Sequence, residues 1–137
     1  MPNPPAPLPE RRMNGNLGWA DALLDAVIVM DTDLIIRQWN GAAERIFGWS
    51  AAETVGSRLV EFCIPPHLRD AHIEGVRRYL ETGEKVVIDT PIELPAMRAD
   101  GSTISIELSL TTARGGPDNA EFFIAFMRDI SALRIAE

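Results

Sequence analysis

The sequence predicts an α+β fold in which a five-stranded antiparallel sheet carries helices on one face. The predicted elements follow the order strand–strand, several helices, then three strands. Helices inserted between a hairpin and a three-stranded meander favour a single sheet with one covered face. The chain has 137 residues, of which 46% are hydrophobic, and this supports one buried core.

Two segments precede the predicted domain. Five of the first nine residues are prolines, so residues 1–13 are expected to form an extended leader or linker. Residues 14–25 place leucines and alanine at helical spacing, which predicts an amphipathic flanking helix. The domain itself is expected over 26–130, and 131–137 is expected to begin an exit linker or signalling helix.

The first two predicted strands form a hairpin. The continuous apolar run 26–30 is typical of a strand covered on both faces. A turn at 31–33 leads into a second strand at 34–39.

Short helices follow, and their ends carry recognisable signals. Asn40 is expected to cap a helix over 41–47, and the segment 50–53 has the form of a capping box that begins another helix. The segment 66–82 predicts the longest helix, which ends at Gly83.

Three strands close the predicted domain. They are expected at 85–95, at 103–112, where polar and apolar residues alternate, and at 121–129, which is apolar on both faces and should be central. Pro91 cannot donate to a strand ladder, so the first of the three is expected at a sheet edge or with a bulge.

Motifs across roughly residues 19–137 carry a resemblance to PAS domains. The opening half of that family resembles DAVIVMDTDLIIRQWNGAAERIFGWSAAETVG, including its W-N step and F-G-W-S-x-x-E-x-x-G signal. The closing strands of the family are similar to RADGSTISIELSL and FMRDISALRIAE. The resemblance implies the PAS fold and a sensory function without catalysis.

The long helix carries a narrower resemblance. The segment HLRDAHIEGVRRYLETGEK is similar to the matching helix of haem-binding PAS sensors of the FixL and direct-oxygen-sensor types. In those families a histidine of this helix is the axial iron ligand, and the matching residue here is His72. The resemblance places Arg78 near a haem propionate, and the remaining expected cofactor-binding residues are apolar: Val76, Val87, Ile92, Leu108 and Leu110.

The residue pattern of this helix is consistent with that expectation. Leu68, His72, Val76 and Leu80 recur every four residues, so His72 lies within an apolar stripe. Gly75 costs a helix interior about 1 kcal/mol, which indicates close approach of another group. A core histidine bonded to a carbonyl, beside a glycine that only eases packing, fits the same pattern. Haem b, no cofactor and an unknown small molecule therefore all remain open.

Several features depart from related cofactor sites. The position of the FixL-type distal arginine is Ile92, and that of the direct-oxygen-sensor methionine is Thr90. Val87 and Ile92 have opposite strand parity, so both face inward only if a bulge intervenes. The cysteine of flavin-binding LOV domains falls on Leu59, and Cys63 is expected to be a buried small hydrophobe, so flavin is not expected.

Composition and motifs limit the function classes. The formal net charge of −7 gives no basic footprint for nucleic acid, and no apolar run approaches the length of a membrane span. Phosphate-binding loops and catalytic motifs are absent from the sequence, so no enzymatic activity is expected of this domain. The expectation is a cytoplasmic sensory domain that passes its signal to a neighbouring kinase, cyclase or transcriptional regulator.

Two alternatives stay open beside a haem sensor. The first is a dimerisation and relay module without a cofactor, pairing as a homodimer through the N-terminal helix and the sheet. The second is a pocket for a small organic acid, whose carboxylate would meet Arg78 or Arg69.

Overall fold

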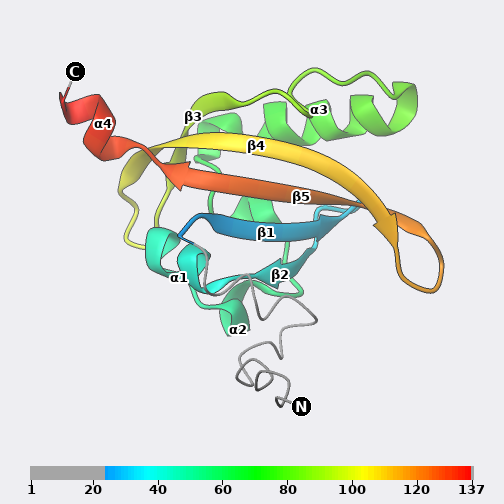
Figure 1. Cartoon of the computed structure of the whole chain (residues 1–137), viewed down its shortest axis with the longest axis horizontal. Coiled ribbons are helices and arrows are strands. Elements are labelled where there is room, and N and C mark those ends of the chain that lie inside the picture. The colour runs from blue at the N-terminus through cyan, green and yellow to red at the C-terminus, as the bar shows by residue number, and fades with distance from the viewer. Residues whose placement is uncertain (1–23, 137) are drawn as a thin grey trace, which may run out of the picture.

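The computed structural model describes residues 24–136, and its strands curve past the helices as one twisted sheet (Figure 1). The predicted leader at 1–13 lies outside these residues. The predicted flanking helix at 14–25 also lies outside them, apart from its last two residues.

Within the described residues the sheet has five strands in the order β2-β1-β5-β4-β3, and every neighbouring pair is antiparallel. The expected α+β fold, with a five-stranded antiparallel sheet, is confirmed. The strand that is apolar on both faces is central, and the proline-flanked strand is at an edge, as the sequence predicted. The strands are β1 (Ala26–Asp31), β2 (Ile36–Trp39), β3 (Ile92–Met97), β4 (Thr103–Gly115) and β5 (Ala120–Asp129).

The helices between β2 and β3 begin and end close to the predicted positions. Gly48 and Gly83 end α1 and α3 in the left-handed conformation, with φ of 83° and 73°. Ser50 and Glu53 form the predicted capping box of α2. The described helical segments are α1 (Gly41–Phe47), α2 (Ala51–Thr54), η3 (Leu59–Glu61), η4 (Pro66–Leu68), α3 (Arg69–Thr82) and α4 (Ser131–Ala136).

Asn40 fixes the start of α1 against β1. Its buried Oδ1 accepts hydrogen bonds from the Ala43 backbone N–H (3.0 Å) and from the Val27 backbone N–H (2.9 Å). Its Nδ2 donates to the Asp25 carbonyl at 3.0 Å. One side chain therefore caps the helix and satisfies the strand beside it.

The core lies between the sheet and the first helices. Inward residues of β1 and β5 pack there, among them Ile28 and Phe123, against Trp39 and Phe47. The rings of Trp39 and Phe47 are 5.8 Å apart, and the Trp39 indole N–H donates to the Trp49 carbonyl at 2.9 Å. The two largest side chains of the core are thus buried, and the one polar atom they carry, the Trp39 indole nitrogen, has a hydrogen-bond partner.

The predicted strand at 85–95 is wrong in its first part. Residues 84–91 form a loop, and β3 begins only at Ile92. Asp89 takes a φ of 66° and its N–H donates to the Leu110 carbonyl at 2.7 Å, which directs the loop away from antiparallel pairing. Val87 lies in this loop and not in a strand, so no bulge is needed for Val87 and Ile92 to face the same side. Strand β3 pairs with β4 in continuous register.

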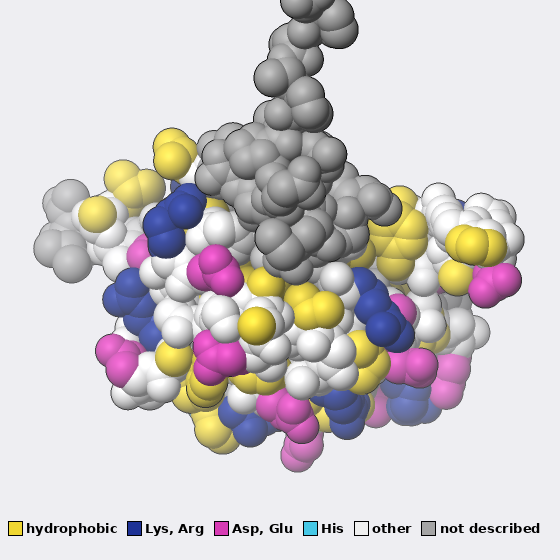
Figure 2. Space-filling view, turned by 90° about the horizontal axis from the view of Figure 1, so that it is seen from below, with side chains coloured by type: hydrophobic (Ala, Val, Ile, Leu, Met, Phe, Trp, Pro, Cys, Tyr) yellow, Lys and Arg dark blue, Asp and Glu magenta, His cyan; other side chains and the backbone are white. Residues whose placement is uncertain are grey.

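The face of the molecule shown in Figure 2 carries acidic and basic side chains interspersed with small hydrophobic areas. The negative net charge is therefore not gathered into one acidic patch on this face. Among the helices that the structure describes, none is long and apolar enough to cross a membrane.

Candidate ligand pocket

Helix α3 stands apart from the sheet, and a cavity of about 520 Å³ separates them. None of the fourteen residues of α3 is buried, although apolar side chains recur along one of its faces. The helix is held near its two ends. The Arg69 Nε donates to the Ile64 carbonyl at 3.0 Å, and the Tyr79 hydroxyl donates to Glu121 Oε2 of β5 at 2.7 Å.

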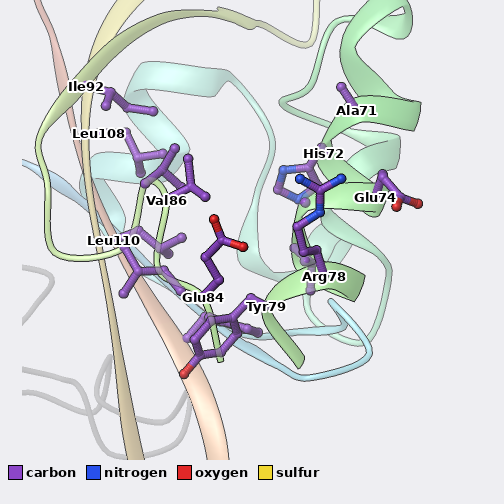
Figure 3. Close-up of a pocket in the computed structure, with 15 residues that line it drawn as sticks. Ala71, His72, Glu74, Arg78, Tyr79, Glu84, Val86, Ile92, Leu108 and Leu110 are labelled. Atoms are coloured by element: carbon purple, nitrogen blue, oxygen red, sulfur yellow. The ribbon is translucent and has the colours of Figure 1, made fainter. Parts of the chain in front are cut away.

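The cavity has an aliphatic wall, a helical wall and a charged rim (Figure 3). The seven site residues expected from the sequence all line it: His72, Val76, Arg78, Val87, Ile92, Leu108 and Leu110. The structure thus brings together residues that the sequence spreads over three elements and a loop.

His72 presents an unpartnered nitrogen in this region. Its Nε2 is buried and has no hydrogen-bond partner within residues 24–136. Burial lowers the pKa of His72 from its ordinary value of 6.5, so the imidazole is neutral at pH 7. The hydrogen bond to a carbonyl that a core histidine would make is not present at Nε2 in the described residues. A neutral imidazole on an apolar cavity is a group suited to a metal or a hydrogen-bonding ligand.

Gly75 leaves the helical wall open. A Cβ added at this position would meet no atom within 4 Å. The glycine is therefore not required by close packing against another part of the protein. It lines the cavity beside His72, where the missing side chain adds to the space for a ligand.

Several residues that line the cavity were not expected from the sequence. Tyr79 lies on the cavity face and its ring packs edge-on against Phe123, with centroids 5.8 Å apart. Its spacing from Val76 and Gly75 is helical, which is a usable signal. The loop residues Glu84 and Val86 gave no such signal because their position depends on how the chain turns after α3. The other lining residues that were not expected are Ala71, Glu74, Ile88 and Phe123.

The rim carries Arg78 and two glutamates. Arg77, on the neighbouring helical position, takes both Glu74 and Glu81 as ion-pair partners. Arg77 therefore lowers the pKa of Glu74 most, and Arg78 adds a smaller Coulombic effect. Within residues 24–136 neither Arg78 nor Glu84 takes part in an ion pair. Figure 3 shows the Glu84 carboxylate directed into the space between the aliphatic wall and the side chains of α3.

The single cysteine lies away from the cavity. Cys63 is buried, as expected, and burial raises the pKa of its thiol. Neither Cys63 nor Leu59 lines the cavity. In the described part of the chain no cluster of three or more His, Cys, Asp or Glu side chains could hold a metal ion.

A family model described as the PAS fold matches residues 20–130 of this chain. A protein of Azorhizobium caulinodans is 41% identical over 111 residues, which are 81% of this chain and 15% of that protein. The sensor protein FixL of Bradyrhizobium diazoefficiens is 34% identical over 107 residues, covering 78% of this chain and 21% of FixL. This chain therefore spans a minor part of the length of both relatives.

Solved structures share the same architecture. A PAS domain from Colwellia psychrerythraea superposes with a TM-score of 0.68 at 22% identity, covering 85% of this chain and 95% of that one. A structure described as a flavin analogue in a light-oxygen-voltage domain has a TM-score of 0.60 at 25% identity, covering 80% of each chain. These similarities are similarities of fold.

Proposed function

Because the chain belongs to the PAS fold family, we propose that it is a sensory domain of a signal-transduction protein whose cavity holds haem through His72. One observation carries the proposal. His72 lines an apolar cavity of about 520 Å³, and its buried Nε2 has no hydrogen-bond partner among the described residues. The similarity to sensor protein FixL over 78% of this chain supports it.

The lining residues fit such a group. His72 would supply the nitrogen that holds the group, and the open surface at Gly75 would leave room beside it. Arg78 at the rim would meet a propionate, and the aliphatic wall would keep water from the bound group. When bound, haem would supply an iron that can bind a small gas or change its oxidation state.

A haemin titration tests this proposal. Purified protein titrated with haemin should develop a Soret band with saturation at one equivalent, and His72→Ala should abolish the band. The matched control is His67→Ala, because His67 is the other histidine of the chain and is exposed on η4. Circular dichroism of each variant establishes that it is folded. A band of equal strength in folded His72→Ala protein would overturn the assignment.

A pocket for an organic acid is the second candidate. Arg78 lies at the rim of an apolar cavity without an ion-pair partner in the described chain, which is the arrangement that binds an apolar molecule with one carboxylate. Arg69, the other basic residue considered, does not line the cavity and donates to the Ile64 carbonyl. Mass spectrometry of denatured, freshly purified protein would identify such a molecule.

We do not expect flavin chemistry of the LOV type in this chain. That chemistry needs a cysteine at the bound group, and Leu59 occupies the matching position. The thiol of Cys63 is buried away from the cavity. A flavin absorption band in purified protein would contradict this assignment.

We further propose that two copies pair through the outer face of the sheet and relay the signal to a neighbouring output domain. Val29, Ile124 and Phe126 lie on that face, opposite the core residues of the same strands. Helix α4 is joined to the sheet because the Ser105 N–H donates to Ser131 Oγ at 3.2 Å. Light scattering over a dilution series should show a dimer in the parent protein and a monomer after Ile124→Glu.

The proposed module is non-catalytic and cytoplasmic, and any catalytic output would belong to the neighbouring domain. A relay without a cofactor remains the alternative if neither haem nor a co-purified molecule is found.

A further inference from the structure

We propose that Glu84 is a specificity-determining residue of the cavity, because its carboxylate repels an acidic group of the ligand that pairs with Arg78. The inference rests on the proposed function, that an apolar ligand bearing an acid enters this cavity. Haem propionates and a straight-chain carboxylic acid share this chemistry.

The turn after α3 directs Glu84 toward the cavity. Gly83 ends the helix in the left-handed conformation, and its N–H donates to the Tyr79 carbonyl at 2.7 Å. The Glu84 N–H then donates to Thr82 Oγ1 at 3.1 Å. The chain therefore reverses immediately, and the first residue of the loop lines the same cavity as the helix that precedes it (Figure 3).

The other rim charges are already engaged. Glu74 lines the rim, but Arg77 holds it together with Glu81 on the exposed face of α3. Arg78 and Glu84 line the cavity without a salt bridge to each other or to other described residues. The guanidinium of Arg78 is thus the cation available to a ligand acid, and the Glu84 carboxylate is the anion that such an acid would approach.

Binding of an acid then has to overcome this carboxylate. Two like charges a few ångströms apart at a hydrated rim repel by about 1 kcal/mol, which is about a fivefold change in affinity. Glu84 is exposed and lies at the start of an irregular loop, so its side chain has room to turn away when a ligand acid pairs with Arg78. A ligand of the same shape without the acid gains nothing from Arg78 and is not repelled by Glu84.

Matched pairs of probes test the inference. The dissociation constants of dodecanoic acid and dodecanol, and of haemin and haemin dimethyl ester, would be measured for the parent protein, Glu84→Gln, Arg78→Gln and Glu81→Gln. The Glu84→Gln variant should bind the acidic member of a pair about three- to tenfold more tightly and leave the neutral member within about twofold. Arg78→Gln should weaken only the acidic member. Glu81→Gln should change neither.

Three outcomes separate the proposals. If Glu84→Gln behaves like Glu81→Gln, the inference is wrong while the cavity proposal stands. If Glu84→Gln tightens acidic and neutral probes equally, Glu84 acts only by its size, and the electrostatic inference is likewise overturned. If the folded parent protein binds none of the four probes, the proposed function fails and the inference fails with it. If the protein binds only the haemin pair or only the dodecanoic acid pair, that result identifies whether the cavity accepts haem or a straight-chain acid.

Discussion

Helices α1 and α3 differ in how closely they pack against the sheet. In α1, Ala42, Ala43 and Phe47 are buried and complete the core. In α3, which is twice as long, no residue is buried, and a cavity occupies the place where a core would be. The comparison shows that the sequence specifies a packed half and an open half within one domain.

Local tethers explain the difference. The α1 region is fixed by Asn40, whose side chain bonds to the backbone of β1 and to the first turn of the helix. The α3 helix is attached near its ends, through Arg69 and Tyr79, and among residues 24–136 its middle makes no hydrogen bond to the sheet. Protein interiors are normally close-packed, so side chains lining such a space lack contacts that a ligand would supply.

The largest effect is expected in the packed half. Phe47→Ala should lower the free energy of unfolding by about 3–5 kcal/mol, because it leaves a cavity beside the Trp39 ring. Denaturant unfolding followed by fluorescence measures it. A loss below about 1 kcal/mol would mean that this half is not packed as described.

Removal of the tether should have the next largest effect. Asn40→Ala should cost about 2 kcal/mol, since two buried backbone N–H groups, of Val27 and Ala43, lose the acceptor oxygen that bonds them. The control is Ser50→Ala at the α2 cap, which lies nearer the surface and should cost about 1 kcal/mol. Equal losses in the two variants would show that Asn40 acts only as a helix cap.

The open half should be less sensitive to truncation. Val76→Ala should cost less than about 1 kcal/mol in the absence of ligand, because Val76 borders the cavity and is only half-buried. Val60→Ala removes the same atoms from a buried position and should cost more. The comparison of the two halves breaks down if the two variants lose the same stability.

The smallest effect is expected in the pH dependence of stability. The folded pKa of His72 is lowered by burial, so the unfolded chain takes up a proton first as the pH falls through about 6.5. Below this pH the unfolded chain gains a proton that the folded chain does not bind. The free energy of unfolding therefore falls with pH until His72 is protonated in the folded state too. Free energies of unfolding at about pH 7.5 and pH 5.5 should differ less in His72→Gln than in the parent. His67→Gln should leave the difference unchanged.

The sequence was sufficient for elements whose signals are local. The caps at Asn40 and Ser50, the helix end at Gly83 and the central position of β5 all follow from residue types at fixed spacing. The start of β3 could not be predicted in this way. Its position depends on Asp89, a non-glycine residue with a positive φ, which is held by a hydrogen bond to β4.

The candidate site divides in the same manner. The seven expected residues came from helical spacing and from the resemblance to haem-binding PAS sensors, and all of them line the cavity. Glu84 was missed because only the left-handed turn at Gly83 brings it back beside α3. Phe123 was missed because strand pairing, rather than any spacing in the sequence, places β5 under the cavity.

The pairing of the first and last strands has a mechanical consequence. Ala26 lies opposite Met127, so the backbone enters and leaves the sheet at one end, about 4.8 Å apart. A change in sheet twist would rotate the incoming and outgoing segments against each other without altering the distance between them. This geometry therefore permits rotation between two adjacent backbone segments more readily than a change in their separation.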